Sequence, residues 1–179
     1  MSTHIALLRA VNVGGRKVSM AELREAIAAL DGFENVRTLL QTGNLVFEAS
    51  GPDAGLEQRI EDAVEATFGL RSEAMVRSAS EWDEAIAANP FAKEAREIPA
   101  YTVLSALKAE PVEGGLEALR AVIPGNERVE IVGRNAYFVY PDGQGVSKLM
   151  PAMIERRLGV RGTARNWNTV LKLQAMAAA

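Results

Sequence analysis

The stretch HIALLRAVNVGGRKVSMAELREAI, residues 4–27, predicts a strand, a loop and a helix in succession. Its first five residues form a nearly continuous apolar run, which is typical of a strand buried on both faces. Gly14 and Gly15 then mark a loop. Ser19 stands three residues before Glu22, the spacing of a capping box, in which each side chain bonds the other's backbone N–H. The apolar residues that follow recur at helical spacing: Met20, Leu23, Ile27 and Leu30.

Outward from this stretch, the first half continues with two strands, a helix and a strand, at residues 35–40, 45–48, 52–69 and 73–77. Gly43–Asn44 supplies a hairpin turn between the two strands. The order βαββαβ is the ferredoxin-like pattern, with two helices on one face of an antiparallel sheet and with the first and third strands at its centre. Another helix starts near Ser80. Glutamates recur every fourth residue of the second helix and predict a solvated face: Glu57, Glu61 and Glu65.

The second half repeats this order with little residue identity, and its elements are expected at 101–107, 116–123, 128–132, 136–140, 148–158, 160–164 and 167–176. Both halves end in a strand followed by a helix with a tryptophan near its start, Trp82 and Trp167. Prolines interrupt the periodicity within 89–99, where we expect a linker. The sequence therefore predicts an α/β (α+β) fold of two ferredoxin-like repeats with mainly antiparallel sheets, each followed by a short helix. The predicted domains are residues 1–92 and 93–179.

Composition excludes several classes of site. The 179 residues include no cysteine and a single histidine, His4, so no Cys-ligated or multi-histidine metal site can form, and we expect neither metal nor cofactor. The net charge of −3 and the sequence pI of 5.4 argue against a general nucleic-acid binder. Residues 1–92 carry 8 basic and 14 acidic side chains, whereas the stretch from Arg134 onward carries 7 and 2. No apolar segment is long enough for a membrane span and no leader is visible, so we expect a cytoplasmic protein.

The loop VNVGGRKV, residues 11–18, is the first candidate site, because a glycine loop ahead of a helix N-terminus is a common way to hold phosphate or carboxylate. It matches neither nucleotide fingerprint, and a tight connection with solvated Arg16 and Lys17 is the alternative. QTGN, residues 41–44, offers amide donors and acceptors in the hairpin turn, where a turn with polar flanks is the plainer explanation. In this topology both loops lie at the same end of the sheet, so a joint site with Arg9 and Asn12 is feasible.

Two further stretches lie in the basic half. PDGQGVSK, residues 141–148, leads into a helix, and its Ser147 and Lys148 could hold an anion. In TARNWNTVLKL, residues 163–173, the helical spacing places Arg165, Asn168 and Lys172 on one face, while Trp167, Val170 and Leu171 are expected to face inward. His4 is expected to be a partly buried structural residue rather than a general base.

These stretches resemble the bacterial domain-of-unknown-function 1697 family. The resemblance rests on LLRAVNVGGRKVSMAELREAI at 7–27, on VRTLLQTGN with VF at 36–47, and on TARNWNTVLKL at 163–173. Val11 and Thr42 replace the usual Ile and Ser and preserve the chemistry. The resemblance implies two ferredoxin-like repeats and no established activity. It singles out, without roles, Arg9, Asn12, Gly14, Gly15, Gln41, Gly43, Asn44, Arg165, Asn166, Trp167, Asn168, Thr169 and Lys172.

The leading hypothesis is a binding module for an anionic ligand, either a nucleotide-like metabolite or a short nucleic acid. The expected ligand-binding residues are Arg9, Asn12, Gly14, Gly15, Lys17, Gln41, Gly43, Asn44, Arg165, Asn166, Asn168, Thr169 and Lys172. One alternative is a metal-independent enzyme for a phosphate- or carboxylate-bearing substrate, with lysine and arginine as electrostatic groups; no catalytic residue is identified. Another is an assembly protein that forms oligomers through a free sheet edge.

Overall fold

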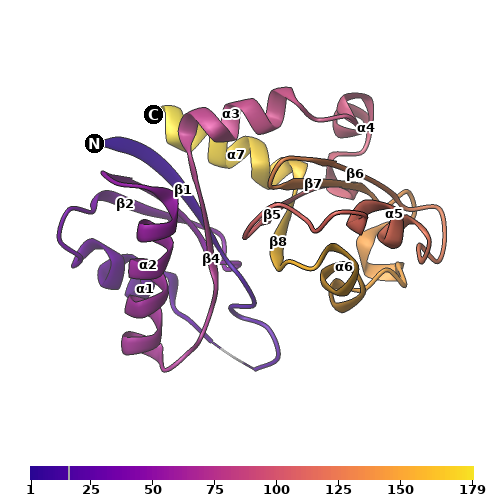
Figure 1. Cartoon of the computed structure of the whole chain (residues 1–179). Coiled ribbons are helices and arrows are strands. Elements are labelled where there is room, and N and C mark those ends of the chain that lie inside the picture. Colours follow the sequence, from indigo (N-terminus) through magenta and orange to yellow (C-terminus); the bar gives the residue numbers. More distant parts are fainter. Residues whose placement is uncertain (16) are drawn as a thin grey trace. The chain divides into compact units, whose positions relative to one another are not determined.

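The computed structural model describes residues 1–15 and 17–179 (Figure 1). The chain divides into two compact units. Unit 1 contains Met1–Glu84 together with Lys172–Ala179, and unit 2 contains Ala85–Leu171. The sequence-based division into domains at residues 92 and 93 stays a prediction. None of the described helices is long and apolar enough to cross a membrane.

Unit 1 has the predicted ferredoxin-like order. Its elements are β1 (Ser2–Leu8), α1 (Met20–Ala28), β2 (Glu34–Leu39), β3 (Asn44–Ala49), α2 (Asp53–Phe68), β4 (Ala74–Ser78) and the start of α3 (Ala79–Ala87). The strands pair antiparallel in the order β2-β3-β1-β4, which confirms that the first and third strands are central. Figure 1 shows α1 and α2 side by side along the sheet.

The core of unit 1 lies between these helices and one sheet face. It gathers alternate residues of the strands, such as Leu8 and Phe47, with the apolar stripes of α1 and α2. Burial of each such side chain stabilises the fold by roughly 1.5–3 kcal/mol. His4 belongs to this layer, because its ring stacks on Phe47 at 5.6 Å and its Nδ1 donates to the Ser2 carbonyl at 2.9 Å. The prediction of a structural histidine is confirmed, and its side chain is only 3% exposed.

The predicted solvated glutamate face of α2 is wrong for two of its three members. Glu57 is buried, and its Oε1 accepts from the Val76 backbone N–H at 3.0 Å. Glu61 accepts from the Ala74 N–H at 3.0 Å in the same way. These N–H groups lie on the outer side of β4, the edge strand, where no further strand pairs. The two carboxylates therefore occupy the outer donors of a sheet edge.

Unit 2 repeats the architecture with different residues. Its elements are the end of α3, α4 (Ala92–Glu97), η1 (Pro99–Tyr101), β5 (Thr102–Leu107), α5 (Gly115–Arg120), β6 (Arg128–Val132), β7 (Asn135–Val139), η2 (Gln144–Val146), α6 (Pro151–Leu158), β8 (Gly162–Asn166) and the start of α7 (Trp167–Ala178). The sheet order is β6-β7-β5-β8, again antiparallel, so the predicted repeat of fold is confirmed.

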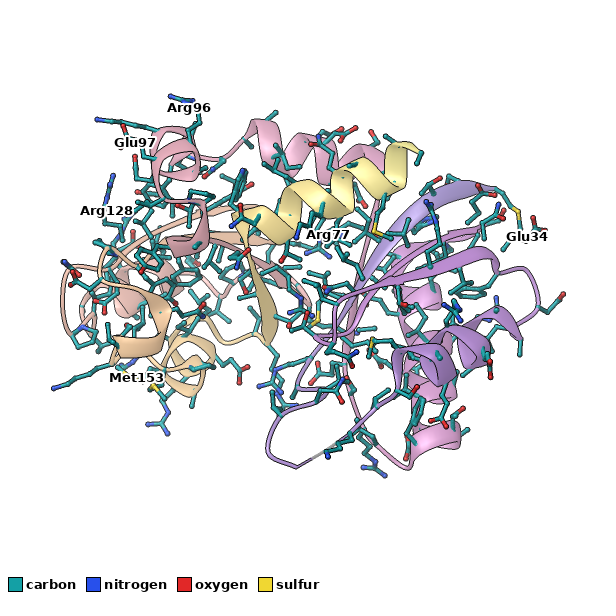
Figure 2. All side chains as sticks on the ribbon, turned by 180° about the vertical axis from the view of Figure 1, so that it is seen from behind. Glu34, Arg77, Arg96, Glu97, Arg128 and Met153 are labelled. Carbon is teal, nitrogen blue, oxygen red and sulfur yellow. The ribbon has the colours of Figure 1, made fainter. Side chains whose placement is uncertain are left out.

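The stretch predicted as a linker contains the short helix α4, and tertiary contacts hold it. The Arg128 guanidinium of β6 lies 4.7 Å from the centre of the Phe91 ring and donates to Glu94 at 3.2 Å. Figure 2 shows Arg128 on the same side of unit 2 as Arg96 and Glu97 of α4. A six-residue helix is too short to be stable alone, which explains why local periodicity did not reveal it.

The same pattern of backbone hydrogen bonds occurs separately within each unit. In unit 1, the Leu8 N–H donates to the Gly43 carbonyl at 2.8 Å and the Arg9 N–H to the Glu73 carbonyl at 2.9 Å. In unit 2, the same bonds at the same lengths run from Leu107 to Arg134 and from Lys108 to Arg161. In both units, therefore, the first strand ends between the hairpin turn and the start of the last strand.

Unit 1 is completed by the last residues of the chain. The carboxyl-terminal part of α7 belongs to it, and the Gln174 side-chain amide donates to Asp83 of α3 at 2.9 Å. The start of α3 is fixed by a capping box, since the Ser78 N–H donates to Glu81 at 2.7 Å and the Glu81 N–H donates to Ser78 Oγ at 3.1 Å.

Candidate functional site

Two loops meet at one end of the sheet of unit 1, and we call this place the loop end. One loop is Arg9–Ser19, between β1 and α1, and the other is the turn Leu40–Gly43, between β2 and β3. The Asn12 side-chain amide joins them by donating to the Gln41 carbonyl at 2.6 Å. The prediction that both loops lie at the same end of the sheet is confirmed.

Asn12 organises the first loop. Its Oδ1 accepts from the Val18 N–H at 2.6 Å, and its Nδ2 donates to the Val18 carbonyl at 3.1 Å as well as to Gln41. Both ends of the amide are therefore engaged with backbone groups. Asn12 positions the segment that it encloses, and a ligand would contact that segment rather than the Asn12 amide.

The QTGN motif is mostly built into the turn. Gly43 has φ +84°, and a Cβ there would lie 2.6 Å from Val11 Cγ2 and 2.9 Å from Leu8 Cβ, so only glycine fits. Asn44 is fully buried at the start of β3, where its Nδ2 donates to the Leu39 carbonyl and to Thr42 Oγ1, each at 2.8 Å. The hairpin turn thus ends at Gly43, one residue earlier than predicted. Gln41 keeps an exposed side chain.

Between Asn12 and Val18 the loop presents open backbone and charge. Gly14 and Gly15 have φ +59° and +84°, and an added Cβ at either would meet no atom within 4 Å. Lys17 is exposed, while Arg16 lies outside the described residues. Arg9 is half-buried at the base, and its carbonyl accepts from Ser72 Oγ at 2.6 Å.

Exposed apolar side chains flank this segment, a feature that sequence reasoning missed. Val13 is 54% exposed and Leu40 is 49% exposed, and they sit on the two loops that Asn12 joins. Exposed side chains and glycines are the parts of the loop end that a ligand can reach.

Backbone strain is concentrated at the loop end. Ala10, Asn12 and Leu40 have φ values of +59°, +55° and +58°. These values lie in the left-handed region, which most residues other than glycine disfavour. Among residues 1–15 and 17–179, only Asn35 joins them as a non-glycine residue with such a backbone. No sequence signal marks Ala10 or Leu40, because neither residue type favours this conformation.

The carboxyl-terminal motif mainly joins β8 to α7. Arg165 was predicted on a helix face with Asn168 and Lys172, but this is wrong, because it lies in β8 and pairs with Leu104. Its guanidinium is buried and donates to Thr163 Oγ1 and to the Ala164 carbonyl, each at 2.8 Å. Burial lowers the pKa of Arg165 to about 10, so the group stays protonated at neutral pH.

The rest of this motif forms the first turns of α7. Asn166 Oδ1 accepts from the Thr169 N–H at 3.1 Å, as an N-cap does. Trp167 is buried, which confirms its predicted place in the core, and Thr169, two residues further along, is buried as well. Asn168 and Lys172 are the polar members of the motif with exposed side chains. Leu171 is 43% exposed, so the prediction that it faces inward is wrong, whereas Val170 is buried as predicted.

The third predicted stretch, residues 141–148, lines a pocket in unit 2. The Ser147 hydroxyl is engaged within the protein rather than open to an anionic ligand. Its Oγ donates to Glu127 Oε1 at 2.6 Å and accepts from the Leu149 N–H at 3.1 Å. This hydrogen bond is the main reason that the pKa of Glu127 is lowered. Tyr140 lines the same pocket, and burial, with the nearby Glu127 charge, raises the pKa of its hydroxyl.

Replacing Ser147 by alanine is expected to raise the pKa of Glu127 toward its ordinary value of 4.5, because the principal stabiliser of the carboxylate is lost. In the parent protein this carboxyl contributes stability above the unfolded-state pKa, and the contribution is lost as pH falls through the lower folded-state pKa. Ser147→Ala should therefore reduce the loss of stability on the acid side. A side-chain NMR titration of Glu127 measures the shift, and Ser147→Thr, which retains a hydroxyl, is the control.

Sequence reasoning missed Glu127 and Tyr140 although a topological signal was available. In an antiparallel hairpin, the residues before the first strand meet those after the second. Arg128 pairs with Val139, so Pro124–Glu127 and the segment from Tyr140 onward must come together. Turn residues on both sides of the predicted hairpin, Pro124–Gly125 and Pro141–Gly143, were the visible sign of this meeting.

Comparisons with known proteins agree with this fold. The conserved bacterial protein SP0830 from Streptococcus pneumoniae has a similar solved structure, with a TM-score of 0.80 and 19% sequence identity over 100% of this chain and 99% of that one. At this identity the likeness establishes the fold alone. A search of curated proteins finds no significant match. The family model described as "Protein of unknown function (DUF1697)" matches residues 1–137, and the chain therefore belongs to this family.

Proposed function

We propose that this protein is a binding module for an anionic, nucleotide-like metabolite, which it holds at the loop end of unit 1. The concentration of strained backbone carries the proposal. A left-handed conformation costs a non-glycine residue roughly 1–2 kcal/mol, and such strain tends to persist where a ligand site requires it. Ala10 and Leu40 bear this cost in two loops that the Asn12 side chain ties together, whereas asparagine itself adopts this backbone more readily.

The chemistry of the exposed segment favours a phosphate group. Gly14 and Gly15 leave the backbone open to close approach, and Lys17 adds a positive charge beside them. The N-terminus of α1 follows directly, where backbone N–H groups and the helix dipole attract anions. Ser19 caps this helix by accepting from the Glu22 N–H at 3.4 Å, the acceptor half of the predicted capping box.

Apolar contact next to this charge favours a nucleotide-like ligand over bare phosphate. Val13 and Leu40 are about half exposed on the joined loops, so a ring system bound beside the phosphate would cover them. Gln41 adds an exposed amide that can read the edge of such a ring. A short nucleic acid is the second form of this proposal, because it offers the same phosphate and base.

The expected binding residues divide into two roles under this proposal. Direct contact is assigned to the residues of the loop end with open backbone or accessible side chains: Gly14, Gly15, Lys17 and Gln41. Asn168, in unit 2, and Lys172, in the last part of α7, stay predicted binding residues without an assigned role in this site. Positioning is assigned to those engaged in the turns of unit 1: Asn12, Gly43 and Asn44. Arg165, Asn166 and Thr169 belong to unit 2 and stay predicted binding residues without an assigned role in this site. Arg9 lies at the base of the loop and belongs to the proposed site through its charge.

The alternatives have less support. An enzyme would need an acid or base at the site, yet the single histidine, His4, is stacked in the core. Assembly through a sheet edge is opposed at both edges of the sheet of unit 1. At β4, Glu57 and Glu61 of α2 occupy the outer N–H groups. At β2, the register shifts between Glu34 and Arg37. Figure 2 labels Glu34 at the outer margin of this unit. The proposal uses no cofactor and places the protein in the cytoplasm.

Calorimetric titration of the full chain with ADP, adenosine and inorganic phosphate tests this function. We expect ADP to bind most tightly, and Lys17→Ala to weaken ADP about tenfold while leaving adenosine unchanged. Higher salt should weaken ADP binding as well, because exposed charges are screened. Lys93→Ala, at an exposed lysine of α4, is the matched control and should have no effect. The proposal fails if none of the three probes binds; binding of an oligonucleotide instead would select its second form.

A further inference from the structure

The last strand of each sheet is an edge strand, and in unit 1 carboxylates close its outer edge. In an antiparallel pair, alternate residues turn their N–H groups toward the partner strand and the others turn theirs outward. Every outward N–H of β4 donates to a glutamate carboxylate. The donor and acceptor pairs, at 3.0, 3.0 and 2.7 Å, are Ala74 with Glu61, Val76 with Glu57, and Ser78 with Glu81.

The corresponding edge of β8 in unit 2 is open. The bond from the Lys108 N–H to the Arg161 carbonyl matches the one that fixes the register of β4 in unit 1. The outward N–H groups of β8 are therefore those of Gly162, Ala164 and Asn166. Among residues 1–15 and 17–179, no group accepts a hydrogen bond from any of the three. The donors that hold carboxylates in unit 1 have counterparts in unit 2 that are open to a partner.

The difference comes from the helix that precedes each strand. α2 has 16 residues and lies along β4, whereas α6 has 8 residues and packs against α5 (Figure 1). Counted back from the glycine that ends each helix, Glu57 and Glu61 correspond to Ser147 and Pro151. Neither residue supplies a carboxylate, and the Ser147 hydroxyl is engaged with Glu127. The shorter helix of unit 2 therefore provides nothing equivalent to the two glutamates of α2.

Burial follows the same contrast. Ala74 and Val76 are fully buried beside α2. Their counterparts in β8 are Gly162, which is half-buried, and Ala164, which is exposed. A glycine and an alanine place no large side chain over the backbone. The outward N–H groups of β8 are thus accessible to a partner, as those of an uncovered sheet edge are.

The open edge is better suited to acceptors than to another strand. An added strand would donate to the outward carbonyls as well as accept from the N–H groups. The Ala164 carbonyl already accepts from the buried Arg165 guanidinium at 2.8 Å. In unit 1, the Arg77 guanidinium donates to the Val76 carbonyl at 3.0 Å, on the edge that the glutamates occupy. Carboxylates, which only accept, therefore match this edge.

The charge of the surrounding residues also favours an acidic partner. From Arg134 onward the chain carries 7 basic and 2 acidic side chains. Arg161, directly before β8, is exposed, and so are Arg156 and Arg157 in the last turn of α6. A positive potential around open N–H donors attracts carboxylates and disfavours cationic partners.

We propose that the outer edge of β8 binds an acidic helix of a partner protein, which presents two carboxylates four residues apart. Four residues of a helix rise about 6 Å, and two residues of a strand rise about 6.6 Å, so carboxylates on successive turns reach alternate N–H groups. In unit 1 the earlier glutamate of α2 binds the later residue of β4. A partner helix in the same orientation places its first carboxylate on Ala164 and its second on Gly162. This inference does not depend on the proposed nucleotide binding.

NMR titration of the isotope-labelled full chain with a helical peptide of residues 52–69 tests the inference. The peptide carries Glu57 and Glu61 at the required spacing and is held helical by a staple on its solvent face. It should shift the amide signals of Gly162 and Ala164. A control peptide with glutamine in place of both glutamates should bind about tenfold more weakly, and higher salt should weaken the parent peptide.

Ala164→Glu and Ala164→Lys form a matched pair of variants at this exposed position. The new carboxylate repels the peptide, so Ala164→Glu should weaken its binding about tenfold, whereas Ala164→Lys should bind it at least as tightly as the parent chain does. Urea denaturation verifies that both variants fold. Neither should change the affinity for ADP, which separates this inference from the nucleotide proposal.

Three results would overturn the inference: no binding of the peptide, equal binding of its glutamine control, or equal affinities of the two Ala164 variants. A fourth concerns the free chain. If light scattering shows a dimer that Ala164→Glu dissociates, a second copy of the chain occupies the edge in place of an acidic helix.

Discussion

Gly43→Ala is expected to lower the free energy of unfolding by roughly 2–5 kcal/mol. Two costs combine at this position. The backbone has φ +84°, which an alanine adopts only with strain, and the new Cβ would lie 2.6 Å from Val11 Cγ2 and 2.9 Å from Leu8 Cβ. Both neighbours are buried at the base of the loop end and have little room to move. Urea denaturation of the variant and the parent protein measures the difference.

Gly14→Ala is the matched control for this prediction. It has a comparable φ of +59°, but an added Cβ there meets no atom within 4 Å. We expect only the backbone strain, roughly 1–2 kcal/mol. The difference between the two variants measures the close packing of Gly43, and equal losses in both would show that this packing contributes nothing.

Asn12→Ala is expected to cost roughly 2–4 kcal/mol, because three hydrogen bonds are lost together. The Val18 N–H would lose its acceptor, and the two loops would lose their connection through Gln41. Amide hydrogen exchange at Val18 should accelerate along with the fall in stability. The affinity for ADP should fall too if the proposed site is correct, since the loop would lose its shape.

Two further variants sharpen the test of Asn12. Asn12→Asp retains an acceptor for Val18 but cannot donate to the carbonyls of Val18 and Gln41, so it should be nearly as damaging as alanine. Asn168→Ala removes an exposed asparagine of α7, and alanine is the better helix former, so its stability should stay within about 0.5 kcal/mol of the parent value. An undamaged Asn12→Asp variant would contradict the assigned donors.

The topology could be predicted from the sequence because strand and helix periodicities are local. The short apolar run at 4–8 and the glycines in the turns give the element order, and sheet order follows from handedness. Helix α4 escaped prediction because the contacts that hold it, from Arg128 to Phe91 and Glu94, come from far along the chain. The misassignment of Arg165 has the same origin, since its strand exists only by pairing with β5.

The candidate site was harder to predict than the fold. Polar motif residues such as Asn12 and Asn44 look alike in sequence whether they face a ligand or bind the backbone. Here the amide of Asn12 closes a loop and that of Asn44 is buried in a turn. Exposure is a property of the folded chain, so Val13 and Leu40 emerged only from the structure. The adjacency of the two loops, by contrast, followed from strand direction alone.

The composition of unit 1 has a consequence for the order in which the protein is made. Its compact set of residues is not continuous, because Lys172–Ala179 join Met1–Glu84. A ribosome releases these last residues only after all of unit 2 has been synthesised. The first sheet can form early, but the contact between Gln174 and Asp83 must wait until unit 2 has been synthesised. Completion of the first unit is thereby tied to prior synthesis of the second.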